Sequence, residues 1–192
     1  PRTRPTSTSA AISSLSYPRL DAQEAAKQTI LRWREGGPAL FAEEALGAKP
    51  TEQQWDASRK LVATRRVSIR SGHGTGKSAF MAWTILWFMC CYLPCKVPAT
   101  APTAHQLEDV LWAELAMWFR KMPAEMRNEF EWSAERFCMK AAPNESFAVA
   151  RTSRPERPEA LQGFHAEHLL FVIDEASGIP DAEVEELVEL SG

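Results

Sequence analysis

A glycine-rich segment between two apolar stretches constrains this chain more than any other feature. Residues 67–69 (VSI) predict a short strand, SGHGTGKS follows over residues 71–78, and residues 79–93 are almost wholly apolar. The segment approximates the phosphate-loop pattern G-x-x-x-x-G-K-[ST], with Ser71 at the first glycine position. A strand that feeds such a turn, with a helix beginning at its end, presents backbone N–H groups and a helix dipole to phosphate. The alternative is a glycine turn that merely begins a helix.

The side chains of this segment suit a nucleoside triphosphate and its magnesium ion. Lys77 has the reach to contact the β and γ phosphates and is a predicted catalytic residue, while the Ser78 hydroxyl is a suitable ligand for Mg²⁺. We therefore expect ATP and Mg²⁺ as ligands. The predicted nucleotide-binding residues of the segment are Gly72, His73, Gly74, Thr75, Gly76, Lys77 and Ser78.

A second motif supplies the acids that such a site requires. Residues 168–175 read HLLFVIDE, a continuous apolar strand that ends in two carboxylates. Because α/β sheets bind ligands at the carboxyl ends of their strands, Asp174 is predicted to hold Mg²⁺ and Glu175 to act as the base that activates water. A buried strand followed by an acidic turn is the plainer interpretation of this motif alone.

Alternating strands and helices predict an α/β fold, a three-layer P-loop NTPase of the additional-strand, RecA-like type with a mostly parallel central sheet. We expect a disordered tail over residues 1–19, a helical lead-in over 20–64, and the ATPase core over 65–192. The helical segments and strands expected from the pattern span residues 21–34, 38–46, a third helix capped by Thr51, 79–93, 97–100, 103–121, 137–140, 147–150, 168–173 and 181–190. Pro98 favours an edge position or a strand start for residues 97–100.

Composition narrows the class of protein. The chain has 192 residues, 45% of them hydrophobic, and a formal net charge of -3. This suits one soluble domain with a real core and excludes a protein that coats nucleic acid through overall positive charge. The apolar run over residues 79–93 is shorter than the roughly 20 residues that cross a bilayer, so no membrane partner is expected. The four cysteines are interpreted as reduced thiols.

Three further residue groups are candidates for function. Gln54 lies upstream of the expected strand, where it is predicted to read the adenine edge, with Gln53 as a rival and a solvated helix position as the plainer interpretation. Thr103 most simply caps the next helix, although its loop is also a candidate for contact with DNA. An arginine near the transferring phosphate would help catalysis, but none is assigned. The arginine candidates are Arg70, Arg151, Arg154 and Arg157.

Four segments, in this order, resemble the N-terminal ATPase domain of tailed-phage terminase large subunits: FAEEALGAKPTEQQ, VSIRSGHGTGKS, ATAPTAHQ and ALQGFHAEHLLFVIDEASGIPD. The Walker-type motifs, A over residues 71–78 and B at residues 168–175, are shared by many ATPases, whereas APTAHQ combined with the last segment is far more specific. The resemblance implies a motor that pumps double-stranded DNA through the portal protein into the procapsid. It also implies a ring of subunits, a small terminase subunit as partner, and a loop strand beside the Asp-Glu strand.

The same resemblance implies work in the host bacterial cytoplasm, transiently at the procapsid portal. The sequence ends soon after Glu175, so the family's coupling motif and its C-terminal nuclease domain are expected to be absent, and no DNA cleavage is predicted. Two alternatives stay open. One is a helicase-like (superfamily 2) DNA-dependent ATPase, which the DEAS string favours. The other is a nucleotide-binding prophage fragment without turnover.

Overall fold

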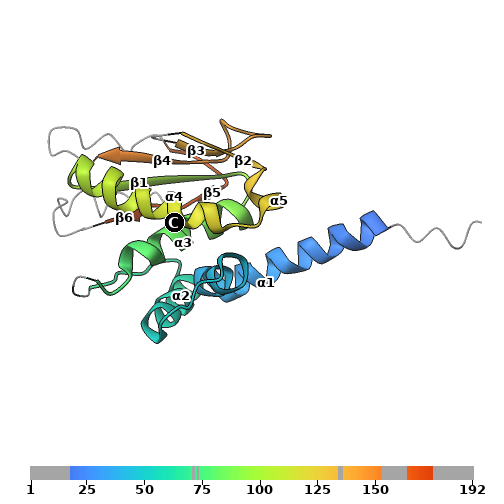
Figure 1. The fold of residues 1–192 in the computed structure, drawn as a ribbon, viewed down its shortest axis with the longest axis horizontal. Helices are drawn as coiled ribbons and strands as arrows, with labels where there is room; N and C mark the ends of the chain where they lie inside the picture. Colours follow the sequence, from blue (N-terminus) through green and yellow to red (C-terminus); the bar gives the residue numbers. More distant parts are fainter. Residues whose placement is uncertain (1–17, 71, 73, 134–135, 153–163, 175–192) are drawn as a thin grey trace, which may run out of the picture.

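The computed structural model describes residues 18–70, 72, 74–133, 136–152 and 164–174 as an α/β arrangement of one sheet with helices packed against it (Figure 1). The helices are α1 (Pro18–Leu46), α2 (Glu52–Thr64), α3 (Lys77–Cys91), a π-helix η1 (Gln106–Trp112), α4 (Ala113–Lys121) and α5 (Ala124–Arg127). The strands are β1 (Cys95–Ala101), β2 (Phe130–Trp132), β3 (Arg136–Met139), β4 (Phe147–Thr152), β5 (His168–Leu169) and β6 (Val172–Ile173). Most of the expected tail over residues 1–19 lies outside the described residues. The whole of the expected helix over 181–190 also lies outside them.

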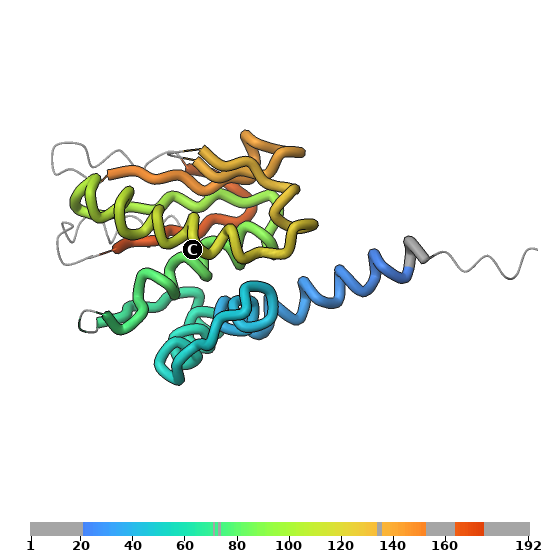
Figure 2. The backbone as a smooth tube through the Cα atoms, in the orientation of Figure 1, coloured from blue at the N-terminus to red at the C-terminus, as the bar shows by residue number. Residues whose placement is uncertain are grey.

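Helix α1 is two helical pieces joined at a break. Gly37 has φ 76° and ψ -174°, a conformation that interrupts the helix and favours glycine. The break confirms the expectation of separate helices before and after Gly36-Gly37. The first piece extends away from the body of the molecule (Figure 2), and residues 21–28 are exposed there. The end of the first piece contacts α3, where the Trp87 side chain donates to the Trp33 carbonyl at 2.7 Å, and Phe41 of the second piece is fully buried.

Helix α2 begins with the cap that the sequence predicts. Thr51 is extended, its hydroxyl accepts from the Gln54 N–H, and the Gln54 side chain accepts in return from the Thr51 N–H. This capping box satisfies two backbone donors at the helix start. One face of α2 is buried, and its residues are Gln54, Ala57, Ser58 and Leu61.

Helix α3 is apolar on nearly every side and forms the centre of the core. It lies between α1 on one side and the sheet and α4 on the other. Trp83 and Trp87 are almost fully buried in it, and Trp83 meets Trp118 of α4 edge to face at 5.2 Å. Trp112 and Trp118 are also buried, so all four of these tryptophans pack in the core. In the part of the chain that the structure describes, no helix combines the length and apolar character that a membrane span needs.

The sheet is mixed, which corrects the expectation of a mostly parallel one. Its order is β2-β3-β4-β1-β5, and β6 also pairs with β1. Strand β1 runs parallel to β4, β5 and β6, whereas β3 is antiparallel to both β2 and β4. The connections from β2 to β3 and from β3 to β4 are short. Neighbouring strands joined by so few residues must be antiparallel, because a parallel pair requires a long crossover.

Strand β1 has a neighbour on both sides and Pro98 lies in its middle, so the expected edge position or strand start for Pro98 is wrong. Lys96 is paired with Leu169, and Ala99 with Val172. This register places Val97 and Pro98 opposite residues 170–171, which separate β5 from β6. Pro98 has no N–H to donate to the ladder, and the ladder is interrupted beside it. The apolar run over residues 168–173 therefore forms two short strands instead of the continuous strand expected.

Two other expectations are corrected. Residues 67–69 form no strand, and neither do their neighbours at 66 and 70. Among the described residues, β6 has β1 as its neighbour, so the expected loop strand beside the Asp-Glu strand is absent there. A strand requires a ladder partner for its backbone groups, and none of the described strands provides one.

The expected helix over residues 103–121 is not α-helical throughout. It begins with η1, where the Ala113 N–H bonds to the Glu108 carbonyl, an i to i-5 bond. The wider turn changes which side chains face the core. Leu107 and Leu111 are buried, whereas Val110 is 41% exposed.

Candidate functional site

The glycine-rich segment lies directly at the start of α3, as expected. Gly72 and residues 74–78 are described, whereas Ser71 and His73 lie outside the described residues. Gly76 is the N-cap of α3 and has φ 80° and ψ 23°, the left-handed conformation that glycine adopts without strain. Because Gly76 has no side chain, it cannot cap the helix start with one. The first turn of α3 therefore suits an anion, which backbone N–H groups and the helix dipole attract.

The loop is folded back on itself through one carbonyl. The oxygen of Gly72 accepts from the Lys77 ammonium at 2.9 Å and from the Thr75 hydroxyl at 3.1 Å. Thr75 is exposed, while Lys77 and Ser78 are half-buried. The ammonium is thus held over the loop, where a bound anion oxygen would be an alternative acceptor for it.

Gln54 lies against this loop, in a way that its position in the sequence does not indicate. Its side-chain N–H donates to the Gly76 carbonyl at 3.0 Å, and its side-chain oxygen accepts from the Thr51 N–H at 2.9 Å. The side chain is buried, with the residue only 8% exposed, whereas its expected rival Gln53 is exposed. The solvated alternative for Gln54 is therefore excluded.

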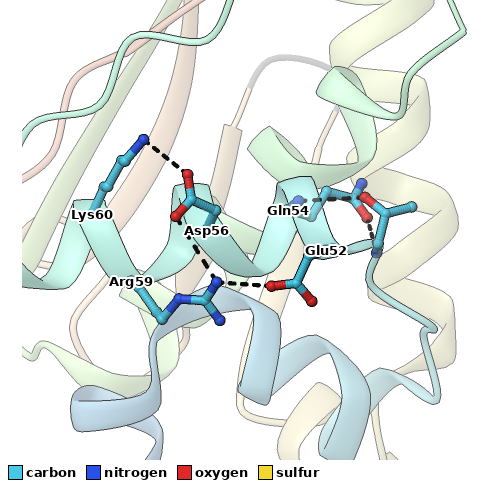
Figure 3. Close-up of polar contacts among 6 residues, drawn as sticks. Glu52, Gln54, Asp56, Arg59 and Lys60 are labelled. Atoms are coloured by element: carbon cyan, nitrogen blue, oxygen red, sulfur yellow. Dashed lines mark hydrogen bonds and ion pairs between the residues drawn. The ribbon is translucent and has the colours of Figure 1, made fainter.

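The face of α2 opposite to Gln54 carries an exposed row of charged side chains (Figure 3). Arg59 lies 3.0 Å from Glu52 and 3.9 Å from Asp56, and Lys60 lies 2.8 Å from Asp56. The hydrogen bond from Lys60 lowers the pKa of the Asp56 carboxyl. Exposed ion pairs of this kind contribute little to stability. The contact of α2 with the glycine-rich loop is on its buried face.

Asp174 follows β6 immediately, as the apolar pattern predicts. It is 9% exposed, and its N–H donates to the Thr100 carbonyl at 2.9 Å. Thr100 is itself paired with Ile173, so β1 fixes the position of the acid's backbone. Glu175, the predicted base, lies outside the described residues.

The loop and the acid are on the same side of the molecule. In Figure 1 the carboxyl ends of β4 and β6 and the amino end of α3 all point to the left. Carboxyl ends of parallel strands are where α/β sheets bind ligands. The start of α3 and the end of β6 therefore lie on the same side of this view, although about a hundred residues separate them in the sequence.

Thr100 is a residue at this edge that the sequence analysis does not single out. It is 1% exposed, and its hydroxyl has no hydrogen-bond partner among the described residues. A buried polar group without a partner is uncommon in folded proteins. The only signal for it in the sequence is a polar residue within an otherwise apolar strand.

The donor atoms at this edge suit magnesium. The Ser78 hydroxyl and the Asp174 carboxylate are hard oxygen donors, which Mg²⁺ prefers together with phosphate oxygens and water. The described residues contain no cluster of three or more His, Cys, Asp or Glu side chains that would form a complete protein cage. A magnesium ion bound mainly through phosphates does not require such a cage.

The cysteines stay outside this site. Cys90 and Cys91 end α3, whose opposite end carries the loop, and Cys95 begins β1. Burial raises the pKa of Cys91 and of Cys95 to about 12. All four cysteines are free thiols, and protonated buried thiols are poor nucleophiles.

The arginine candidates are only partly described. Arg70 and Arg151 are exposed, and Arg151 lies near the carboxyl end of β4. Arg154 and Arg157 lie outside the described residues. The assignment of an arginine to the transferring phosphate therefore stays open.

These features define an α/β protein with a glycine-rich loop at the start of its central helix and a buried acid at the end of a parallel strand. No protein-family model matches the chain. Over 170 residues the chain is 29% identical to the "Probable terminase, large subunit" of Enterobacteria phage P7. The match covers 78% of this chain and 32% of that protein, so the chain spans about a third of its relative's length.

Proposed function

We propose that this chain is the ATP-hydrolysing motor domain of a phage terminase large subunit, with a P-loop NTPase fold of the additional-strand type. The observation that carries the proposal is that the start of α3, which follows the loop, and the end of β6, which Asp174 follows, lie on the same side of the molecule in Figure 1. The likeness to a protein named as a probable terminase large subunit supports the packaging role.

Each residue has a distinct role in the proposed site. The backbone N–H groups of residues 72–78 surround the phosphates, and Lys77 turns from the Gly72 carbonyl to the β and γ phosphate oxygens. Ser78 and Asp174 hold Mg²⁺, which neutralises phosphate charge when bound. Glu175 follows Asp174 in the sequence, accepts the proton of the attacking water and orients that water.

The proposed partners follow from the packaging role. They are double-stranded DNA, the portal protein, a small terminase subunit and further copies of the full-length protein in a ring. The chain works in the host cytoplasm and at the procapsid portal.

Phosphate release by the purified chain tests the enzymatic part. Lys77→Ala and Glu175→Gln should each lower kcat by about 100-fold or more, the usual effect of removing an acid-base or charge-stabilising group. Lys49→Ala and Glu167→Gln change exposed residues outside the proposed site and should leave kcat within twofold. Parent-level turnover in Glu175→Gln would show that Glu175 is not the base.

The packaging part is tested with DNA. Double-stranded DNA should stimulate phosphate release by the full-length protein, and purified procapsids should then take up that DNA in an ATP-dependent manner. Strand separation without uptake would instead support a helicase-like ATPase. Calorimetric binding of ATP without any phosphate release would support a nucleotide-binding protein without turnover.

A further inference from the structure

The peptide group between Gly76 and Lys77 is held from outside the loop by Gln54. The Gly76 carbonyl accepts two hydrogen bonds: one from the Gln54 side chain at 3.0 Å and one from the Phe80 N–H at 3.0 Å. The second of these is the first helical bond of α3. The Gly76 carbonyl and the Lys77 N–H belong to one planar, trans peptide, so fixing the carbonyl also fixes the direction of that N–H. The two groups point opposite ways, which directs the N–H away from Gln54.

The contact is close as well as polar. A Cβ atom added at Gly76 would lie 2.7 Å from the side-chain nitrogen of Gln54. Such a separation is too short for a real carbon–nitrogen contact. Gln54 therefore packs directly on the backbone of the loop, at the residue whose left-handed conformation turns the chain into α3.

Gln54 is held rigidly enough to act as a support. Its oxygen is engaged by the Thr51 N–H in the capping box, which leaves one rotamer for the carboxamide. One turn later, the buried hydroxyl of Ser58 accepts from the Ala39 N–H at 3.1 Å and donates to the Gly36 carbonyl at 3.4 Å. The buried face of α2 is thus tied to the break in α1 at one point and to the loop at the other.

We propose that Gln54 is a positioning residue of the phosphate loop, acting through Gly76, and not a reader of the adenine base. Its carboxamide holds the Lys77 peptide in the orientation that the triphosphate requires, so its effect is the same for any base. The proposal rests on the proposed function, in which this loop binds the triphosphate.

Two variants remove the hydrogen bond from the Gln54 side chain to the Gly76 carbonyl. Gln54→Glu keeps the side-chain oxygen that completes the capping box, but it removes the donor to the Gly76 carbonyl. Gln54→Met removes the same donor without adding charge, together with the oxygen that accepts from the Thr51 N–H, so an effect common to both variants belongs to the bond to Gly76. The matched control is Gln53→Glu, which introduces the same charge at the exposed neighbouring residue.

The first measurement needs no ligand. Hydrogen exchange of the Phe80 amide, whose N–H donates to the same Gly76 carbonyl, is followed by NMR in the full chain. It should be about tenfold faster in both Gln54 variants than in the parent and Gln53→Glu, because the start of α3 loses the second hydrogen bond that holds this carbonyl. Unchanged exchange in both Gln54 variants would overturn the proposal, whether or not the chain binds nucleotide.

The second measurement separates positioning from base reading. Calorimetry with the magnesium complexes of ATP, GTP and inorganic tripolyphosphate should show all three weakened by the same factor, about tenfold, in both Gln54 variants. Weakened ATP binding with unchanged tripolyphosphate binding would assign Gln54 to the adenine base and overturn the proposal. Failure of the parent to bind any of the three would count against the proposed function alone, because the exchange measurement still decides the role of Gln54.

Discussion

The backbone N–H of Asp174 donates a hydrogen bond to the carbonyl oxygen of Thr100, 2.9 Å away. This bond joins the end of β6 to the carboxyl end of β1, an internal strand of the sheet. The position of the acid therefore depends on the register of β1 and not on the local sequence around Asp174. A substitution that keeps the backbone but changes the side chain should alter chemistry while preserving the fold.

Asp174→Asn tests the proposed magnesium ligand. The variant keeps the N–H bond to Thr100 and nearly the same volume, so its stability should stay close to that of the parent. Loss of the charged oxygen should raise the Mg²⁺ concentration for half-maximal phosphate release by about tenfold or more. Asp56→Asn, an exposed acid of α2, is the control and should leave the magnesium titration unchanged. Coincident titrations of Asp174→Asn and parent would remove Asp174 from the metal site.

The break in α1 should tolerate no side chain. Gly37→Ala places a Cβ atom 2.5 Å from the Ser58 hydroxyl at a positive φ of 76°, so it combines strain with overpacking. We expect the free energy of unfolding to fall by about 3 kcal/mol. Gly47→Ala also has a positive φ but nothing within 4 Å of its Cβ, and should cost only about 1 kcal/mol. Urea denaturation of both variants measures the difference, and equal losses would contradict the packing at Ser58.

The π-helix predicts unequal effects at two neighbouring residues. Leu111 is fully buried, so Leu111→Ala should destabilise the chain by about 3 kcal/mol. Val110 is 41% exposed, and Val110→Ala should change stability by no more than about 0.5 kcal/mol. Thermal or urea denaturation distinguishes this arrangement from a regular α-helix with both residues on its buried face, for which both variants would be destabilising.

Buried thiols should make the fold sensitive to alkaline pH. Burial raises the pKa of Cys91 and Cys95 from 9.0 to about 12. Since the folded pKa is the higher one, their contribution to stability is complete below pH 9 and is lost as pH rises toward 12. Between pH 9 and 12, ionisation of each thiol in the unfolded chain should lower the free energy of unfolding by up to about 1.4 kcal/mol per pH unit.

Urea midpoints across the pH range test this dependence. The double variant Cys91→Ala/Cys95→Ala should show a shallower decline above pH 9 than the parent, with slopes that coincide between pH 6 and 8. Burial also raises the pKa of Cys90 and of Tyr92. Part of the decline in stability above pH 9 should therefore remain in the double variant. Equal slopes above pH 9 would show that these thiols ionise as readily in the folded chain as in the unfolded one.

The sequence by itself determined the local elements whose cause is local. The capping box of Thr51 and Gln54 depends on residues three apart, and the break at Gly36-Gly37 depends on glycine's access to positive φ. The start of α3 after Gly76 follows from the glycine-rich turn and the apolar run behind it. The presence of strand structure before Asp174 was also predictable, because a continuous apolar run is typical of a strand that is buried on both faces.

Only the tertiary structure decided what depends on partners distant in sequence. The internal place of β1 despite Pro98, and the gap between β5 and β6 opposite it, arise from strand pairing that no local pattern encodes. Residues 67–69 have the composition of a strand, but a strand forms only where another one completes its hydrogen bonds. The contact from Gln54 to Gly76 joins residues 22 apart, because the packing of α2 brings them together.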